Sequence, residues 1–398
     1  MSRRRRRTTP ALPPPLEDED LLREILLRLP PQPSSLPRAS LVCKLWRNIM
    51  SDPQFLERFR KHHRKPPLIG FFTGDYFSTN PLFAPILDPP DRINSIHFAM
   101  PRSSSTNRSW NFMDCRHGLA VLINKSRRET MVCDPLTGQK HHTKFPRRLN
   151  NPRLKYSWHA TVLCVDDEDG HVHGDCFSSP FKLVLICIGY MQSCACVYDS
   201  ASGVWGNVVS TPYMLCSKRL SVLVGNALYW LLSRGDVLAF DFERQCFHVI
   251  EKPAAAKTTN YRSVQPLRTE DGRLGLALLS GLTIKLWERK SNGDGVVGWV
   301  LLHKVIPIER VFPIIPHEGM YPWRMPSYDK RFLLVGYDEA TNVIVLSTMI
   351  GNFMVQLDSM QIRHIIKRNH MCYDTFYPYI NFYIAGREVG WKWMDLKL

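Results

Sequence analysis

The chain has 398 residues, of which 44% are hydrophobic and 22% charged, and its formal net charge is +16. This length allows two or three domains, and the absence of any run of eighteen apolar residues excludes a predicted membrane span. The N-terminal MSRRRRR carries charge without an apolar stretch behind it, so it is not a secretory signal. The eleven cysteines are therefore predicted to be reduced thiols of a nuclear or cytoplasmic protein.

Positive charge is concentrated at the start of the chain. Residues 1–65 contain fifteen Lys or Arg and seven Asp or Glu, so they carry +8 of the total. The Arg3–Arg7 run lies in a predicted disordered tail, residues 1–14. It is either a nuclear import signal, a weak patch for polyanions, or a tail without a role. We expect the protein in the nucleus, the cytoplasm or both.

Three short amphipathic helices are predicted in a small domain at residues 15–60. Acidic residues begin the first helix, where the helix dipole favours them, and a Pro-Pro pair ends it. The second helix covers roughly 37–50, with Ser35 as its expected cap. Asp52 caps the third helix and Pro53 takes its first position. A unit this small leaves apolar surface exposed, which either meets a partner or packs on the next domain.

This segment resembles the F-box of grass-type F-box proteins. The matching stretches are DLLREILLRLP (20–30), VCKLW (42–46) and SDPQF (51–55). The resemblance implies a Skp-type adaptor as partner and, through it, the cullin and RING subunits of an SCF-type ubiquitin ligase. It implies that Cys43 is a small buried residue and that Trp46 packs as an anchor. The resemblance assigns adaptor contact to Leu16, Leu21, Leu22, Ile25, Leu26, Leu29, Leu36, Val42, Cys43 and Trp46.

The hydrophobic period changes after a predicted linker at residues 61–66. Apolar runs of four to eight residues alternate with turn residues, so residues 67–398 are predicted to be mostly β. Only the segment 365–370 looks helical. A loose repeat of strand, acidic residue, turn and aromatic residue places acidic side chains at positions 134, 199, 241, 288 and 358. Spacings near 45 fit one four-stranded propeller blade, which favours a β-propeller of six or seven blades over a β-sandwich.

Four short stretches of this part resemble the F-box-associated β-domains of plant F-box proteins. They are RKPPLIGFF (64–72), DCRHGLAVL (114–122), CDPLTG (133–138) and YPYINFY (377–383). Each is weak alone, but their order behind an F-box is more specific. The resemblance implies an α+β multidomain receptor whose propeller-like domain selects a protein for ubiquitination.

Catalytic and metal motifs are mostly missing from the sequence. It contains no phosphate-binding glycine loop, no nucleophile elbow and no zinc-protease motif. It has no pair of C-x-x-C motifs, which excludes a RING-type zinc ligase. His171, His173 and Cys176 are the best metal candidates, but no fourth ligand lies nearby in the sequence, so we predict no metal and no cofactor. Structural thiols are expected at Cys194 and Cys196, and solvated imidazoles at His62, His63, His141 and His142.

We expect the target-binding residues in an irregular segment, residues 316–328. It combines the residue types enriched at interfaces. The candidates are Met320, Tyr321, Trp323 and Arg324. The alternative is an ordinary blade connection whose aromatic side chains point inward. The function predicted from the sequence is a substrate-recognition subunit without chemistry of its own. The alternatives are a propeller that binds nucleic acid or carbohydrate outside a ligase, and a propeller enzyme. We expect no membrane partner and no nucleic acid.

Overall fold

The computed structural model describes residues 18–74, 81–100, 110–150, 156–164, 173, 176–189, 192–215, 220–254, 256, 261–280, 283–291, 295–307, 332–348, 350–367 and 374–382. The predicted tail and Leu16 lie outside these residues. The described residues form two compact units. One comprises the residues up to Pro66 together with Phe382, and the other comprises Pro67–Asn381.

The described part of the first unit contains four helices, where the sequence predicted three. They are α1 (Glu19–Leu27), α2 (Ser35–Ser40), α3 (Lys44–Ser51) and α4 (Pro53–His63). The predicted second helix is broken because Cys43 takes an extended conformation, with φ −159° and ψ 176°. Ser40 Oγ also donates to the carbonyl of Pro37 at 2.6 Å, a local bond that competes with helix continuation. Neither glycine nor proline marks this break in the sequence.

Side-chain caps start the first and last helices, and the sequence predicted the one at Asp52. The Asp18 carboxylate accepts from the amides of Asp20 and Leu21 at 3.0 and 3.2 Å. Asp52 accepts from the amide of Gln54 at 3.0 Å. The predicted cap at Ser35 is wrong, because the helix already begins at Ser35 and its preceding residue makes no side-chain cap bond.

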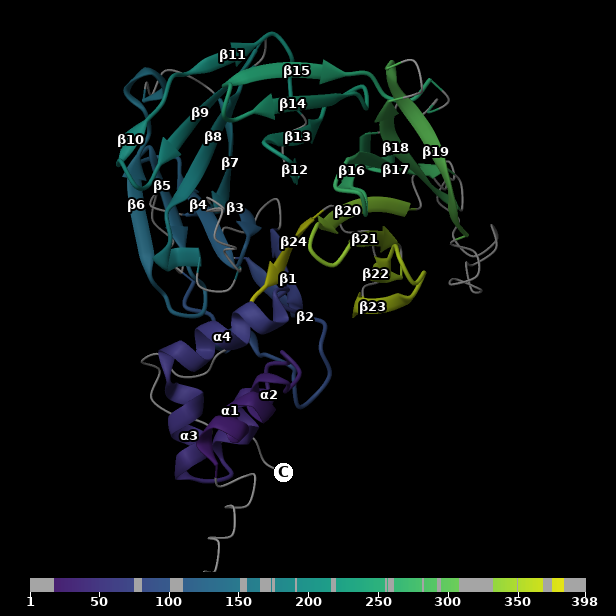
Figure 1. Cartoon of the computed structure of the whole chain (residues 1–398). Helices are drawn as coiled ribbons and strands as arrows, with labels where there is room; N and C mark the ends of the chain where they lie inside the picture. Colours follow the sequence, from purple (N-terminus) through teal and green to yellow (C-terminus); the bar gives the residue numbers. More distant parts are fainter. Residues whose placement is uncertain are drawn as a thin grey trace, which may run out of the picture. The chain divides into compact units, whose positions relative to one another are not determined.

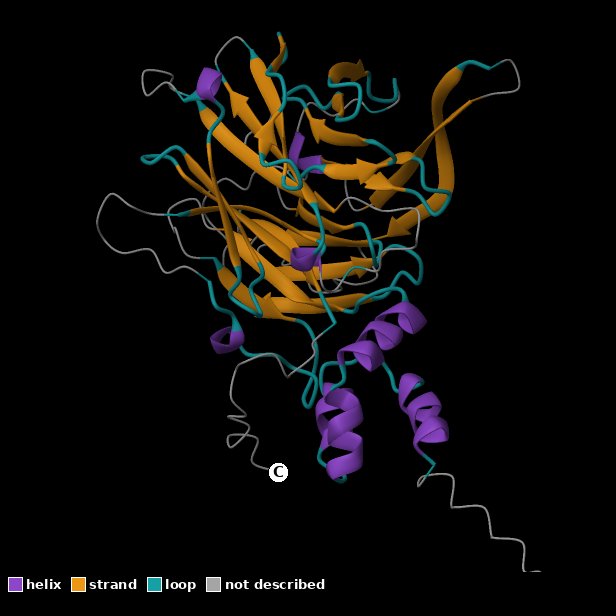
Figure 2. Cartoon of the chain, turned by 60° about the vertical axis from the view of Figure 1, so that its left-hand side comes forward, coloured by secondary structure: helices purple, strands orange, loops and turns teal. Residues whose placement is uncertain are grey.

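All described α-helices of the chain belong to this first unit, and the second unit is built of strands and short 3₁₀ turns (Figure 2). Within the described part of the chain, no helix has the length and the apolar character needed to cross a bilayer.

The second unit contains β1 to β24 in five hydrogen-bonded sheets (Figure 1). Their orders are β2-β1-β24-β20-β21-β22-β23, β3-β4-β5-β6, β10-β9-β8-β7 with β11 on β9, β12-β13-β14-β15, and β16-β17-β18-β19. The first twelve strands are β1 (Leu68–Gly74), β2 (Leu82–Pro85), β3 (Asn111–Arg116), β4 (Leu119–Asn124), β5 (Glu129–Cys133), β6 (Lys140–Lys144), β7 (Ser157–Cys164), β8 (Phe181–Ile188), β9 (Ser193–Asp199), β10 (Val204–Trp205), β11 (Val209–Thr211) and β12 (Val222–Val224). The others are β13 (Ala227–Leu231), β14 (Val237–Asp241), β15 (Cys246–Ile250), β16 (Val264–Arg268), β17 (Leu274–Ser280), β18 (Thr283–Ser291), β19 (Val297–Pro307), β20 (Phe332–Asp338), β21 (Val343–Thr348), β22 (Gly351–Gln356), β23 (Ile362–Lys367) and β24 (Thr375–Ile380).

The largest sheet consists of two blades that are joined by a single pair of aligned residues. Strands β20 and β24 meet in parallel only at Gly336 and Phe376. Strand β1, the first of the unit, pairs with β24, the last, from Leu68↔Ile380 to Gly74↔Thr375. The described strands thus form six blades, and the two ends of the unit share one of them. Such pairing closes a propeller and leaves few exposed sheet edges.

Contacts between the sheets follow the order of the chain and return to its start. Strand β3 touches both β24 and β7, β11 touches β15, β16 touches β12 and β20, and β20 touches β24. Apolar clusters fill these junctions. One cluster joins Val121 of β4 to Leu185 of β8, and another joins Leu231 of β13 to Leu276 of β17. The predicted mostly β fold of six or seven blades is confirmed, and a two-sheet sandwich is ruled out.

The acidic repeat marks the turn between the third and fourth strands of a blade at four of its five positions. The exception is Glu288, which lies inside β18. Asp358 lies in the turn between β22 and β23 and accepts from Asn342 Nδ2 at 2.6 Å. Asp134, Asp199 and Asp241 each accept from the amides two and three residues later. These Asx turns explain why the repeat is visible in the sequence, since short carboxylates favour such turns.

The predicted apolar runs are strands, but the segment that looked helical is not a helix. Its described residues, Ile365 to Lys367, belong to β23 and pair with β22. The nine described cysteines are all thiols. Cys194 and Cys196 are buried in the same apolar cluster, as expected for structural thiols.

Candidate functional site

Large apolar side chains are exposed at two places in the helical unit. Leu21 and Ile25 of α1 are 50% and 41% exposed, and their i, i+4 spacing places them on one face. Leu41 and Val42, at the break between α2 and α3, are 68% and 61% exposed. Exposed apolar residues concentrated in so small a unit are typical of an interaction site.

The ten residues predicted for adaptor contact separate by burial. Leu21, Ile25, Val42 and Cys43 are exposed, and Leu29 and Trp46 are half-buried. Leu22, Leu26 and Leu36 are buried and serve packing, while Leu16 lies outside the described residues. The expectation that Cys43 is buried is wrong for the chain by itself, because the helix break turns this residue outward. Contact with an adaptor stays a prediction for the exposed and half-buried members. Leu41, which the likeness did not assign, joins them.

A charged cluster fixes α1 against the start of α4. Arg23 Nη1 lies 2.8 Å from Asp52 Oδ2, and Arg23 Nη2 lies 2.8 Å from Glu19 Oε1. The hydrogen bond from Arg23 lowers the pKa of Asp52, and the same bond raises the pKa of Arg23. Since Asp52 also caps α4, one carboxylate links the two helices, and this linkage helps to hold Leu22 and Leu26 inward and Ile25 outward.

Two of the four histidines predicted to be solvated make specific contacts instead. His63 Nε2 lies 3.0 Å from the carbonyl oxygen of Leu27, and burial lowers the pKa of His63. His141 Nε2 lies 3.1 Å from Tyr198 Oη, and burial lowers its pKa too. Both positions were misjudged because neighbouring basic residues in the sequence suggested a solvated surface.

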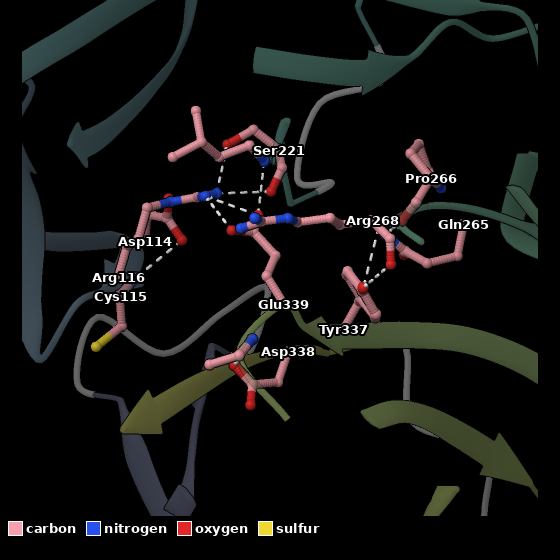
Figure 3. A network of polar contacts seen from close by, with 12 residues as sticks. Asp114, Cys115, Arg116, Ser221, Gln265, Pro266, Arg268, Tyr337, Asp338 and Glu339 are labelled. Carbon is pink, nitrogen blue, oxygen red and sulfur yellow. Dashed lines mark hydrogen bonds and ion pairs between the residues drawn. The ribbon is translucent and has the colours of Figure 1, made fainter. Parts of the chain in front are cut away.

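A polar network links four blades of the second unit (Figure 3). Arg116 Nη1 lies 2.7 and 2.8 Å from the two carboxylate oxygens of Glu339, and Arg116 Nη2 donates to the carbonyl of Ser221 at 2.8 Å. The amide of Leu223 donates to Glu339 at 2.7 Å. Tyr337 Oη meanwhile donates to the carbonyl of Arg268 at 3.1 Å, which adds the blade of β16.

Because the ion pair between Arg116 and Glu339 is buried, breaking it is energetically costly. Burial alone would lower the pKa of Arg116, but the carboxylates of Glu339, Asp114 and Asp338 together outweigh it and the pKa is raised. Burial raises the pKa of Glu339, and Arg116 offsets this only in part. The pair connects the end of β3 to the turn after β20. The sequence predicted no role for this pair, although a lone Arg and Glu beside apolar strands were a usable signal. These contacts hold the blades together.

A surface groove of about 540 Å³ lies between the segments 143–148 and 203–208. Its lining includes the cations Lys144, Arg147 and Arg148, together with the aromatic ring of Trp205. Trp205 Nε1 donates to the carbonyl of Lys144 at 2.8 Å, so its indole is fixed in place. Among the described residues, no acidic side chain lines this groove. An anionic segment of a partner would fit its charge.

Met320, Tyr321, Trp323 and Arg324 lie outside the described residues, so target binding by them stays a prediction. His171 also lies outside them. Among the described metal candidates, Cys176 Sγ lies 3.5 Å from His173 Nδ1.

Two family models match the chain in the two units that the structure separates. An F-box domain model matches residues 18–58 and thus defines the class, an F-box protein. The model described as "F-box protein AT5G49610-like, beta-propeller" matches residues 111–383, more than half of the chain. The chain belongs to this family of F-box proteins with a β-propeller.

Beyond the family, solved structures are only distantly similar to this chain. No curated protein matches the chain. Solved structures that resemble it include the extracellular domain of a one-component system from B. thetaiotaomicron, the fission yeast SREBP–SCAP binding domains and the Dos1 propeller. Identities are 11%, 11% and 10%, TM-scores are 0.34, 0.32 and 0.36, and 66%, 66% and 67% of this chain is covered. The chain spans 28%, 60% and 62% of those chains.

Proposed function

We propose that this F-box protein is the substrate-recognition subunit of an SCF-type ubiquitin ligase. Its F-box would bind a Skp-type adaptor and, through it, the cullin and RING subunits. Its propeller would hold a protein target near the ubiquitin-loaded enzyme. Such a receptor acts by raising effective concentration and needs no catalytic residue. We propose the nucleus, the cytoplasm or both as its location.

The observation that carries the adaptor half is the exposed apolar surface of a unit whose own core is complete. Leu22 and Leu26 are fully buried, so the unit does not need Leu21, Ile25 or Val42 for its packing. Apolar anchors surrounded by polar residues are the usual centre of a protein interface.

For the target half, we propose that the groove lined by Lys144, Arg147, Arg148 and Trp205 receives an acidic segment of the substrate. Its cations supply the attraction and its fixed indole supplies a rigid apolar contact. The propeller-only alternative, nucleic-acid binding, uses the same cations, so the experiment must separate the two.

The test is reconstitution with purified components. The full chain, a Skp-type adaptor, cullin and RING subunits are assembled, and ubiquitination of proteins captured by the chain is measured. We expect capture and modification of a protein target, and loss of modification but not of capture in Ile25→Ala/Val42→Ala. Binding of single-stranded nucleic acid with no adaptor affinity would refute the ligase role and favour the alternative.

The charge of the groove is tested in the same assay with Arg147→Glu/Arg148→Glu. We expect weaker target capture, most strongly at low salt, with adaptor affinity unchanged. Arg234→Glu is the matched control, because this exposed arginine does not line the groove. Unchanged capture by the groove variant would show that the target binds elsewhere on the propeller.

A further inference from the structure

Three side chains from separate parts of the propeller bring metal-ligand atoms together. His117 lies in the turn between β3 and β4, Cys164 ends β7, and His173 comes from the segment that follows β7. One ligand atom from each lies within 4.8 Å of the other two. The ring centroids of His117 and His173 are 3.8 Å apart. A sequence search could not find this set, because His117 lies far from the other two residues along the chain.

Cys176 supplies a fourth donor beside this group. Its Sγ lies 3.5 Å from His173 Nδ1, and its side chain is buried. In a tetrahedral zinc site with bonds of about 2.0 Å to nitrogen and about 2.3 Å to sulfur, neighbouring ligands are roughly 3.5 Å apart. The observed distance therefore matches one edge of such a site.

We propose that His117, Cys164, His173 and Cys176 form a structural Zn²⁺ site. Two thiolates and two imidazoles are the donors that zinc prefers, and no carboxylate belongs to the group. Magnesium and calcium require oxygen ligands, so this donor set excludes them. Thiols kept reduced inside a cell remain available for such coordination.

The local backbone suits a ligand at position 117. His117 and Gly118 form the two-residue turn of a hairpin whose flanking pair is Arg116↔Leu119. Both turn residues have positive φ, 54° and 78°. Asn-Gly is the sequence that such turns favour, so a histidine here is the less favourable choice for the backbone. A metal ligand gives that choice a reason.

The site would bind two blades to each other. It would join the turn after β3 to the end of β7 and to His173 and Cys176. Because Arg116 directly precedes His117, zinc would also fix the turn next to the ion pair with Glu339. A metal that binds the folded chain but not the unfolded chain stabilises the folded state.

The first measurement is the metal content of the full chain, purified without chelator after expression with zinc. We expect close to one zinc per chain by elemental mass spectrometry. Replacement by Co²⁺ should give the visible absorption of a tetrahedral cobalt–thiolate site. Removal of zinc by a chelator should lower the melting temperature. A chain with less than a tenth of an equivalent of zinc and no such cobalt spectrum would overturn the proposal.

Two ligand variants test the assignment. His117→Asn keeps a residue suited to the turn, and Cys164→Ser keeps the size of the side chain. We expect each to reduce zinc content at least tenfold while the near-UV circular dichroism stays native-like. The matched control is Cys246→Ser, since Cys246 Sγ lies 3.2 Å from His248 Nε2 but this pair offers only two donors. Stoichiometric zinc in both ligand variants would refute the site.

Cys176→Ser tests the fourth ligand. A weakened cobalt–thiolate band together with reduced zinc content is expected. An unchanged band and full zinc content would refute the place of Cys176 in the site. If a variant fails to fold, the wild-type cobalt spectrum and the effect of the chelator still decide the proposal.

Discussion

Two neighbouring residues of α1 separate docking from folding in the F-box. Ile25 is 41% exposed and Leu26 is 0% exposed, although they are adjacent on the same helix. We predict that Ile25→Ala weakens adaptor binding without loosening the helix, and that Leu26→Ala loosens the helix first. Both changes shorten a four-carbon side chain to a methyl group, so they form a matched pair.

The magnitudes follow from burial. Truncating a fully buried leucine leaves a cavity and costs about 2–5 kcal/mol. An exposed side chain outside such a core usually changes stability by less than about 0.5 kcal/mol. As an interface anchor, however, it contributes about 2 kcal/mol or more, which corresponds to roughly a 30-fold loss of affinity.

Hydrogen exchange and binding are measured on the full chain. Exchange of the α1 amides, followed by mass spectrometry, should accelerate roughly 30-fold or more in Leu26→Ala and hardly at all in Ile25→Ala. Adaptor affinity, measured by calorimetry, should fall for Ile25→Ala. Normal affinity in Ile25→Ala, combined with normal exchange and lost affinity in Leu26→Ala, would show that α1 presents the opposite face to its partner.

Three further predictions concern the stability of the two units. Glu339→Ala should lower the urea midpoint of the propeller by an amount equivalent to about 3–5 kcal/mol, because it leaves Arg116 buried without its carboxylate; a smaller loss in the double variant that also carries Arg116→Met would confirm that the unpaired charge is the cause. Asp52 has a pKa lowered chiefly by its hydrogen bond from Arg23, so its ionised form stabilises the folded F-box above pH ~4 and this contribution is lost as the pH falls further; Asp52→Asn should flatten that acid limb, and an unchanged limb would contradict the linkage. Gly336→Ala places a Cβ 2.7 Å from a carbonyl oxygen of β24, so it should destabilise the closing blade; an unchanged melting temperature of the propeller would contradict this close approach.

The sequence identified the strands because their signals are local. GLAVLI and NVIVLST are apolar runs between turn residues, and both form buried strands, β4 and β21. The Asp repeat identified the third turn of three blades for the same reason, since each carboxylate bonds to amides only two and three residues away. Asp358 marks the corresponding turn between β22 and β23 as well, and only Glu288, inside β18, departs from the pattern.

The break in the helix at Cys43, by contrast, could not be predicted from local sequence signals. Residues 37–50 have the apolar spacing of one helix, and no glycine or proline interrupts it. The packing of α3 against α2 and α4 decides instead, and it sends Leu41 and Val42 outward. An apolar period gives the face of a helix only as long as the helix continues, so exposure at this point could not be predicted.

By itself, the sequence determined that short amphipathic helices precede a mostly β domain of blade-length repeats, because caps and turns act over a few residues, while the F-box was indicated by the resemblance of three short stretches to that family. The tertiary structure decided which leucines are buried, that β1 closes the ring with β24, and that Arg116 meets Glu339. It also decided that His117 lies beside Cys164 and His173. These pairs are far apart along the chain, and only the closure of the blades brings them within bonding distance.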